Sequence, residues 1–361
     1  MHIRALEDKN IWGEVIEQCE QYDFYHTFDY HQISKRDGEK PILLEFRDGD
    51  NLIALPLLIR DIDGTPYKDA TSVYGYAGPL TRNITRNFNN ASFKKMLKEF
   101  LMDSQIVSVF SRLHPFIKNQ EPVLSGIGEI IPHGHIVNID LTKNLNEQKR
   151  GYNRRLRTYI NKEAHEYKII DGTCEECLDA FIGVYCENMK RVKANPSYFF
   201  GKKYFYELLA SGQIHARLLV AQHIKTSQLA GGAIFTMNNG IVQYHLSGVK
   251  EEFLNLNPIK LLIDHVRVQS TNEGYSYFNL GGGLGGQDND SLFYFKSGFS
   301  KDFKTFQSWQ YVVDKRKYQQ IIKQKETLDG QNTNNSCFFP IYRQTPPNEM
   351  EISEINCLGN D

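Results

Sequence analysis

The sequence has no long run of apolar residues and no excess of charge of either sign. No stretch approaches the roughly 20 apolar residues that a membrane-spanning helix needs, and the first residues lack the apolar core of a secretory signal. The 42 Lys and Arg residues nearly balance the 43 Asp and Glu residues, so no overall field attracts DNA or an anionic membrane. We therefore expect a cytoplasmic protein without a membrane span that does not bind DNA.

Cysteine is scarce, with six residues in 361. So few cysteines do not suggest a disulfide framework, and they suit a reducing compartment. Cys174 and Cys177 form one C-x-x-C pair, but no third ligand follows at a useful spacing. His133 and His135 flank a glycine and also lack a third partner. We therefore expect no metal site, and we interpret the two histidines as residues of a surface loop.

The signatures of common hydrolases and nucleoside triphosphatases are also missing: there is no Ser nucleophile elbow, no H-E-x-x-H and no P-loop. Gly281, Gly283 and Gly286 do spell G-x-G-x-x-G, yet the dinucleotide fingerprint needs a helix that opens at the glycines and further parallel strands. A hairpin loop whose glycines only supply positive φ is another alternative. Group transfer by direct attack remains the reaction class that the sequence favours.

The most informative stretch is 275–300, YSYFNLGGGLGGQDNDSLFYFKSGFS. Its aromatic and apolar start predicts a strand, and the glycines at 281–283 then remove the side chains where another backbone or a ligand could approach. A polar turn is predicted at 288–291. Lys296 follows it as a lone cation. The apolar residues that we expect to fix its direction are Leu292, Phe293, Phe295 and Phe299.

FNLGGG and SLFYFKSGFS resemble the C-terminal motif of the Fem peptidoglycan-bridge transferases, which belong to the wider GNAT-type acyltransferase superfamily. Two further stretches are similar to that family, residues 241–270 and residues 72–80 (SVYGYAGPL). The resemblance extends over most of the chain, from about residue 20 to about residue 315. It implies tandem acyltransferase-like domains and the transfer of an acyl or aminoacyl group to an amine.

The predicted fold class is α+β, with tandem GNAT-like domains that each contain a mostly antiparallel mixed sheet flanked by helices. In the first half, the predicted order of three strands, a helix and a strand agrees with this. We place a degenerate N-terminal domain at 1–143 and a C-terminal domain with the glycine and lysine motif at 144–328. Residues 329–361 read as a polar tail anchored by the segment CFFPIY.

Residues 144–167 form the one basic concentration in the chain. We predict a helix there, on which Arg150, Arg154 and Arg157 share a face because they are spaced i, i+4 and i+7. Such a stripe could receive phosphates, either from a nucleotide-linked precursor or from tRNA. A solvated helix that links two domains is the alternative.

Gln228, Gly231 and Ala233 match the Q-x-x-G-x-A spelling of a coenzyme A pyrophosphate loop. We predict that they run into a strand, whereas phosphate binding needs a helix N-terminus. The strand-to-helix junction lies instead after Ser247, with Asn257 as the N-cap. The donor substrate is therefore either acyl-CoA held in another way or aminoacyl-tRNA, and we expect no permanently bound cofactor.

Lys296 and Tyr244 are the predicted catalytic residues. Lys296 would neutralise charge on a carbonyl or a phosphate, and Tyr244 or His245 would supply a hydrogen bond or a proton relay. Strand alternation places only one of these two on the site face, and the resemblance favours Tyr244. The residues predicted to bind substrate are Arg191, Asn279, Gly281, Gly282, Gly283, Phe295, Arg150, Arg154 and Tyr76. Those predicted to lie beside a coenzyme are Asn257 and Ser247.

The resulting hypothesis is a monomeric N-acyltransferase. Its acceptor would be an amine of a cell-envelope precursor, which is a small molecule or a lipid-linked or nucleotide-linked intermediate of peptidoglycan or polysaccharide. The alternative is a non-catalytic module that keeps the fold in order to bind an envelope glycan or a protein partner. The intact glycine loop and Lys296 favour the enzyme.

Overall fold

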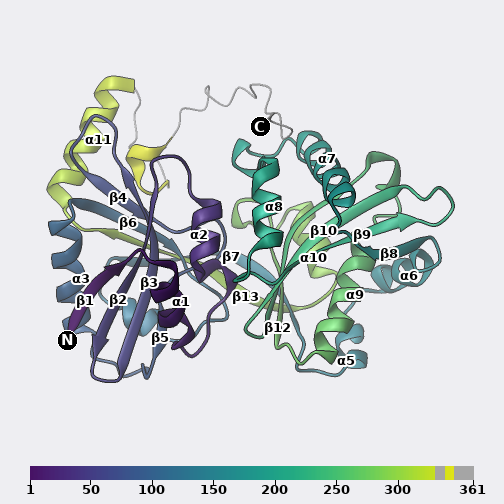
Figure 1. Cartoon of the computed structure of the whole chain (residues 1–361), viewed down its shortest axis with the longest axis horizontal. Coiled ribbons are helices and arrows are strands. Elements are labelled where there is room, and N and C mark those ends of the chain that lie inside the picture. Colours follow the sequence, from purple (N-terminus) through teal and green to yellow (C-terminus); the bar gives the residue numbers. More distant parts are fainter. Residues whose placement is uncertain (330–337, 345–361) are drawn as a thin grey trace. The chain divides into compact units, whose positions relative to one another are not determined.

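The computed structural model describes residues 1–329 and 338–344 (Figure 1). These residues form two compact units: unit 1 is Met1–His133 together with the described chain from Phe306 onward, and unit 2 is Gly134–Thr305. Unit 2 is thus an insertion in the sequence of unit 1. The predicted division at 143 differs from this one, because the chain returns to unit 1 at Phe306, where Trp309 joins the core of the first unit.

Unit 1 contains a sheet in the order β1-β2-β3-β4-β6-β13, and β5 pairs with β3. Neighbouring strands are antiparallel except for β4 and β6. The strands are β1 (His2–Leu6), β2 (Lys40–Asp48), β3 (Asn51–Asp61), β4 (Lys68–Thr71), β5 (Leu80–Arg82), β6 (Ile106–Arg112) and β13 (Asp302–Val312). The helices are α1 (Lys9–Glu17), α2 (Phe28–Ser34), α3 (Ala91–Asp103), α4 (Gln120–Leu124) and α11 (Lys315–Asp329).

The sheet of unit 2 has the order β7-β12-β11-β10-β9-β8. Only β11 and β12 are parallel, and the other neighbours are antiparallel. Asn239 and Gly240, both with positive φ, form a tight turn between β10 and β11. The strands are β7 (Glu129–Asp140), β8 (Tyr167–Asp171), β9 (Ala216–His223), β10 (Leu229–Asn238), β11 (Ile241–Val249) and β12 (Tyr277–Gly282).

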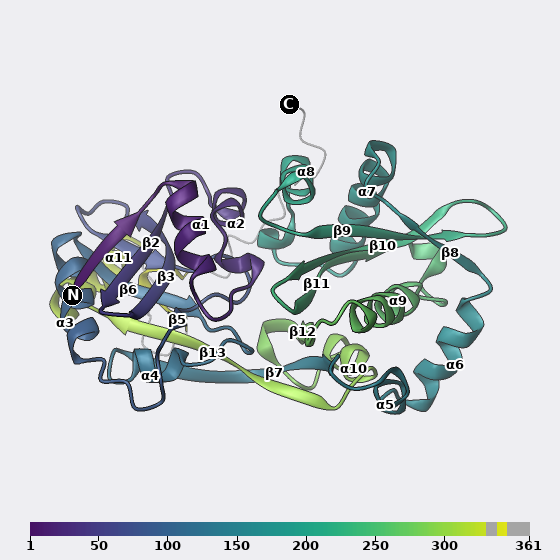
Figure 2. The same cartoon turned by 60° about the horizontal axis from the view of Figure 1, so that its bottom comes forward.

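Helices cover both faces of the sheet in unit 2 (Figure 2). On one face lie α7 (Glu175–Arg191) and α8 (Lys202–Ala210). A Cβ at Gly248 would lie 2.9 Å from the Cα of Tyr185, so this glycine lets α7 approach β11 closely. On the other face lie α5 (Leu145–Arg150), α6 (Arg154–Glu163), α9 (Ile259–Asn272) and α10 (Ser291–Ser297). The predicted arrangement, a mostly antiparallel mixed sheet flanked by helices, is confirmed.

One local prediction is wrong. The basic stretch is not one helix, because α5 ends at Arg150 and Asn153 caps a new helix by accepting the N–H of Leu156 at 2.7 Å. Arg150 therefore does not continue the helical face of Arg154 and Arg157. In the segment 72–79, Gly75 and Gly78 both have positive φ and turn the chain between β4 and β5.

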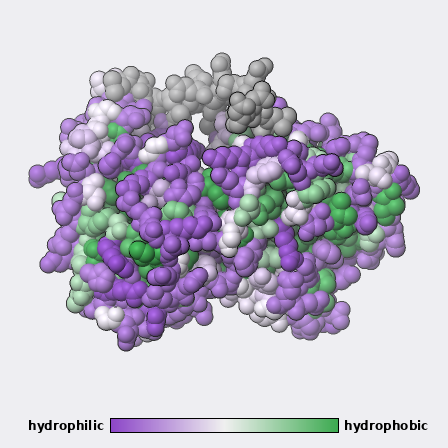
Figure 3. Space-filling view, viewed as in Figure 1, coloured by the Kyte–Doolittle hydropathy of each residue, from purple (hydrophilic) through white to green (hydrophobic). Residues whose placement is uncertain are grey.

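The predicted anchor of the C-terminal tail is present. Residues 338–344 include a short 3-10 helix, Ile341–Arg343, and Tyr342 is buried against Tyr318 and Ile321 of α11. The rest of the predicted tail lies outside the described residues. No helix in the described part of the chain has the length and apolar character to cross a membrane. Hydrophilic residues predominate on the faces visible in Figure 3.

Candidate active site

Each of the three consecutive glycines has a steric reason. Gly281 has φ +79°, and its N–H donates to Oδ1 of the buried Asn279 at 2.8 Å. A Cβ at Gly282 would lie 2.7 Å from the carbonyl oxygen of His135, and one at Gly283 would lie 2.2 Å from a backbone oxygen of its own loop. The glycines thus let the loop fold against β7 and onto itself.

Asp290 connects the glycine loop to the helix that carries Lys296. It is the N-cap of α10: one carboxylate oxygen accepts the N–H of Phe293 at 2.7 Å, and the other accepts the N–H of Leu284 in the loop. The predicted polar turn is therefore the start of a helix. Lys296 lies at its end, in the last turn.

Lys296 is almost completely buried, with 8% of its surface exposed. Its Nζ donates to the carbonyl oxygen of Gly282 at 2.8 Å and lies 6.0 Å from the centre of the Tyr244 ring. Burial lowers the pKa of Lys296 to about 8, although the nearby carboxylate of Asp290 partly opposes this. The structure thus brings the two predicted catalytic residues together.

A β-bulge decides which way Tyr244 and His245 point. The pairing of β11 with β10 shifts by one residue at His245, so Tyr244 and Ser247 share the face that carries α10, and their hydroxyls are hydrogen-bonded. His245 points the other way and bonds the hydroxyl of Tyr204 in α8 at 2.7 Å. Burial raises the pKa of Tyr244 to about 12, so its hydroxyl is protonated at neutral pH.

The two parallel strands beside this pair diverge. β11 and β12 are paired only at their first three positions, ending with Gln243 opposite Asn279. Beyond that point β11 continues against β10, and β12 continues against β7. Among the described residues, β11 after Gln243 and β12 after Asn279 do not pair with each other along their facing edges. Such edges offer backbone N–H and C=O groups to an extended ligand.

The start of α9 offers few free donors. The helix begins at Ile259, one residue later than predicted, and Asn257 has φ +31° instead of capping it. The N–H groups of Lys260 and Leu261 already donate to the carbonyls of Asn257 and Pro258, at 3.2 and 3.0 Å. The first turn therefore closes like a 3-10 helix and loses part of the expected capacity to bind phosphate.

The Q-x-x-G-x-A spelling lies where the sequence predicted. Gly231 and Ala233 are inside β10, which begins at Leu229. A Cβ at Gly231 would lie 2.9 Å from the carbonyl oxygen of Gly248 on β11. This glycine is thus required for close packing between strands.

The remaining predicted residues are spread over the chain. Arg191 is exposed at the end of α7, on the sheet face opposite to α10, and its Nη2 donates to Asn188 at 2.6 Å. Phe295 packs edge-on against Phe299, with ring centres 5.7 Å apart. Tyr76 belongs to unit 1, where it lies 5.5 Å from the ring of Phe306. The structure thus does not bring Arg191 to Lys296.

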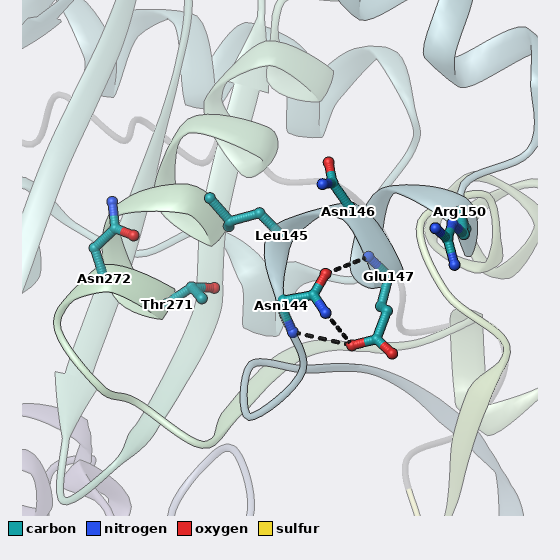
Figure 4. A pocket seen from close by; sticks show the side chains of 7 residues that line it. All are labelled: Asn144, Leu145, Asn146, Glu147, Arg150, Thr271 and Asn272. Atoms are coloured by element: carbon teal, nitrogen blue, oxygen red, sulfur yellow. Dashed lines mark hydrogen bonds between the residues drawn. The ribbon is translucent and has the colours of Figure 1, made fainter.

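Arg150 lines an open depression of about 610 Å³ at the start of α5 and the end of α9 (Figure 4). Asn144 and Glu147 form a capping box at one side of it. Neither Lys296 nor Tyr244 lines it. Arg154, the first residue of α6, is exposed to solvent. The lining residues are Asn144, Leu145, Asn146, Glu147, Arg150, Thr271 and Asn272.

The interpretation of His133 and His135 as loop residues is wrong, because both lie in strand β7. His133 bonds the hydroxyl of Ser308 at 2.8 Å, and His135 bonds Asp288 of the glycine loop. The alternation in HIVNID could have indicated a strand, but its pairing with Asp288 has no sequence signal. No group of three metal-ligating side chains occurs in the described residues.

No family model matches the chain, and no curated protein sequence matches it significantly. Solved structures do match. The crystal structure of FemX aligns with a TM-score of 0.69 at 13% identity, over 89% of this chain and 100% of the FemX chain. The C-terminal domain of a protein assigned as a lysylphosphatidylglycerol synthetase, from Agrobacterium fabrum, aligns with a TM-score of 0.52 at 12% identity, over 88% of this chain and 96% of the other. The chain therefore has a Fem-like fold, as its motifs predict.

Proposed function

We propose that this protein transfers an acyl group to an amine at the point where β11 and β12 diverge. The observation that carries the proposal is the incomplete hydrogen bonding of the buried ammonium group of Lys296. An ammonium group has three N–H donors, and among the described residues Lys296 makes one hydrogen bond, to Gly282. Leaving a buried cation with unused donors is costly unless a ligand accepts from them. A carbonyl oxygen that becomes negative during the reaction is such an acceptor.

The reaction needs little covalent chemistry from the protein. An amine attacks the carbonyl carbon of an ester or thioester, and the oxyanion of the tetrahedral intermediate needs donors already in place. Lys296 supplies one charged donor, held by Gly282 and by its burial in α10. Tyr244 supplies the ring beneath the ammonium group. Loss of one such donor lowers turnover by about 10²–10³-fold in other enzymes.

The donor is proposed to be aminoacyl-tRNA or acyl-CoA, consumed as a substrate. The partly closed first turn of α9 supports weak binding of a coenzyme pyrophosphate. The cations of α5 and α6 support a donor rich in phosphate. These helices place the half-buried Lys149 and the exposed Arg150, Arg154, Arg155, Arg157 and Lys162 within a short stretch.

The acceptor is proposed to be an amine of a cell-envelope precursor. The resemblance of FNLGGG and SLFYFKSGFS to the peptidoglycan-bridge transferases supports this class of acceptor. The likeness in fold to FemX, and to a domain named for lysylphosphatidylglycerol synthesis, is in line with it. We propose that the protein works as a monomer in the cytoplasm.

The test is direct transfer by the purified full chain. Labelled alanyl-tRNA or acetyl-CoA is supplied as donor, with a lysine-containing nucleotide-linked muropeptide as acceptor, and the amide product is measured. We expect product with wild type and at least about 100-fold less with Lys296→Ala. The matched control is Lys301→Ala, because Lys301 also donates to a backbone carbonyl, that of Ser297 at 2.8 Å. Binding of the muropeptide without any transfer would instead support the binding module.

A further inference from the structure

A histidine and a carboxylate meet beside the glycine loop. The backbone N–H of His135 donates to Oδ1 of Asp288 at 2.7 Å, and its ring Nδ1 lies 2.5 Å from Oδ2. Both side chains remain partly exposed, at 45% for His135 and 40% for Asp288. The two residues are 153 positions apart, so only the fold assembles the pair.

The glycine loop is shaped to hold this pair. A Cβ at Gly134 would lie 1.7 Å from the carbonyl oxygen of Gly286 and 2.8 Å from Oδ1 of Asp288. Any other residue at position 134 would therefore push the loop away from β7 and separate Asp288 from His135. Gly286 itself has φ +76°, which favours glycine there as well.

Asp288 sets the tautomer of the ring. A carboxylate at Nδ1 requires the proton there, which leaves the lone pair of the neutral imidazole on Nε2. The hydrogen bond from the His135 backbone, followed by that from its ring, lowers the pKa of Asp288, so the carboxylate is ionised at neutral pH. Within residues 1–329 and 338–344, Nε2 of His135 has no hydrogen-bond partner. It is therefore a basic nitrogen open to a ligand.

The ring lies on the same side of the sheet as Lys296. Residues alternate along β7, so His135 shares its face with Val137 and Ile139, which join the hydrophobic cluster of Phe293 and Phe299 around α10. On the neighbouring strand, Gly282 is paired with Ile136, the residue next to His135. The carbonyl that holds Lys296 and the backbone of His135 are thus adjacent in the sheet.

Aromatic contacts continue from the ring to α10. The His135 ring lies 6.1 Å from the ring of Phe303 in β13, and Phe303 lies 5.5 Å from Phe293. Phe293 precedes Lys296 by three residues, which is about one helical turn.

The charged neighbours of Phe303 do not compete for the histidine ring. Asp302 and Lys304 flank Phe303 on β13 and are paired with each other at 2.7 Å. Asp302 also accepts from Asn138 at 2.7 Å, and Asn138 lies on the sheet face opposite to His135. Among the described residues, Asp288 is therefore the ionisable group that contacts the ring.

We propose that His135, oriented by Asp288, is the general base that deprotonates the acceptor amine. This assignment rests on the acyl transfer proposed above. Nε2 takes a proton from the ammonium form of the acceptor, and the lone pair of the resulting amine attacks the acyl carbon. The bond from the acyl carbon to the ester oxygen or thioester sulfur then breaks, a second proton passes from the nitrogen to this leaving atom, and the imidazolium returns its proton to solvent. The products are an amide and a free hydroxyl or thiol, and His135 is neutral again.

The first test is the tautomer of His135, which can be measured without any substrate. In the full chain labelled with ¹⁵N-histidine, the His135 resonances are assigned by their loss in His135→Gln. We expect a neutral ring protonated at Nδ1 in wild type and a mixture of tautomers in Asp288→Asn. A neutral ring protonated at Nε2 in wild type would overturn the proposal.

The second test compares two acceptors. Nα-acetyl-lysine arrives protonated at neutral pH and needs a base, whereas hydroxylamine is already neutral. With alanyl-tRNA or acetyl-CoA as donor, we expect His135→Gln to slow transfer to Nα-acetyl-lysine by about 10²-fold or more and transfer to hydroxylamine by only a few-fold. Lys296→Met should slow both transfers. The matched control is His133→Gln, two positions earlier on β7, which should slow neither.

The outcomes separate the two proposals. An equal loss with both acceptors in His135→Gln would make His135 a structural residue, and no loss with either would exclude it from the reaction. Both results overturn the base assignment and leave acyl transfer intact. If wild type transfers to neither acceptor from either donor, the acyl transfer fails and the base assignment falls with it.

Discussion

Burial and hydrogen bonding have opposite effects on the pKa of Lys296. Burial favours the neutral amine, while the Gly282 carbonyl and the carboxylate of Asp290 favour the charged form. The result is a lysine whose pKa lies near 8, well below the usual 10.5. Such a group can still donate as a cation at neutral pH, and its charge is poorly screened by water.

Replacing Lys296 with methionine should separate catalysis from stability. The substitution keeps most of the side-chain volume and removes a buried charge, so we expect a melting temperature no lower than that of wild type. Transfer should fall by at least about 100-fold. Thermal melting and turnover are to be measured on the same preparation, with Lys301→Met as control. A large drop in melting temperature with unchanged turnover per folded molecule would make Lys296 structural.

The pH dependence of activity should report the same group. If the ammonium form acts, turnover falls as pH rises through about 8, because Lys296 then loses its proton. This falling limb should be measured as kcat against pH in wild type with hydroxylamine as the acceptor, because hydroxylamine is already neutral in this range. A turnover that rises through the same range would mean that the neutral amine of Lys296 acts instead of its ammonium form.

The free energy of unfolding should rise with pH in the range where turnover falls. The folded-state pKa of about 8 lies below the ordinary value of 10.5, so between these pH values the unfolded chain binds more protons than the folded chain. This group's contribution to the free energy of unfolding therefore rises with pH over that range. Denaturant titrations at several pH values should show a rise that is smaller in Lys296→Met. Identical pH slopes in the two proteins would contradict the shifted pKa.

Individual residues of the candidate site could be predicted where an unusual residue type stands out from its neighbours in the sequence. Lys296 stood out because it is a lone cation among aromatic residues, and the structure places Tyr244 beneath it. The pair of His135 and Asp288 was missed because its residues are far apart in sequence and meet only through β7 and the glycine loop. Arg191 was misplaced relative to Lys296 because a sequence gives the helix but not the sheet face that it covers.

At the scale of elements, the regular pieces of the chain were well predicted and the breaks between them were not. The hairpin of β10 and β11 follows from alternation and from its Asn-Gly turn. The break after Arg150 was missed because Gly151 and Asn153 act through a cap, and the backbone N–H of Asn153 donates to Gly298 at 2.9 Å. A tertiary hydrogen bond of this kind leaves no periodic signal.

The cations of α6 should govern binding of a phosphate-rich donor. In the double variant Arg154→Ala and Arg157→Ala, we expect weaker binding of alanyl-tRNA and a shallower dependence of affinity on salt. A filter-binding series from low to physiological salt measures both. The control is Lys315→Ala with Arg316→Ala, which removes the same charge from exposed positions of α11. Equal affinity of wild type and the α6 variant at low salt would mean that α6 is a solvated linker and does not bind the donor.

The start of α9 should make coenzyme binding weak. Because the N–H groups of Lys260 and Leu261 are already used, and the Q-x-x-G-x-A residues lie inside β10, we expect acetyl-CoA to bind more weakly than to an ordinary acetyltransferase. Titration calorimetry with acetyl-CoA measures this. Tight stoichiometric binding, with no retention of alanyl-tRNA, would exclude the aminoacyl donor.

At the scale of the whole molecule, the two-part architecture was predicted but its boundaries differ. Motifs and element order indicated two mixed sheets, and each unit has one parallel pair in a mostly antiparallel sheet. The sequence did not show that the chain re-enters the first unit at Phe306, because the single strand β13 spans the change. A continuous strand carries no composition signal at such a point.

The C-terminal anchor should matter for the stability of unit 1. The carboxylate of Asp69, buried in β4, accepts from Nε of Arg343 at 2.9 Å, from Arg60 at 2.7 Å and from the hydroxyl of Tyr342 at 3.1 Å. Arg343→Met would leave this carboxylate with one cation fewer, at a cost of about 1–3 kcal/mol in the free energy of unfolding. Denaturant unfolding of the full chain, with Arg316→Met as control, tests this. Equal stability of the two variants would show that the anchor is dispensable.

Because unit 2 is inserted in the sequence of unit 1, the ribosome completes the two units at different times. The described part of unit 2 is one contiguous segment, so every strand of its sheet is available once Thr305 has emerged. Unit 1 must wait, because most of β13 and all of α11 follow Thr305 in the sequence, and until they emerge β6 presents an unpaired edge. We therefore expect unit 1 to finish folding after unit 2, although the first segment of unit 1 is translated before unit 2. Nascent chains arrested once Thr305 has left the ribosome should protect Lys296 from protease while leaving Trp12 of the first unit accessible.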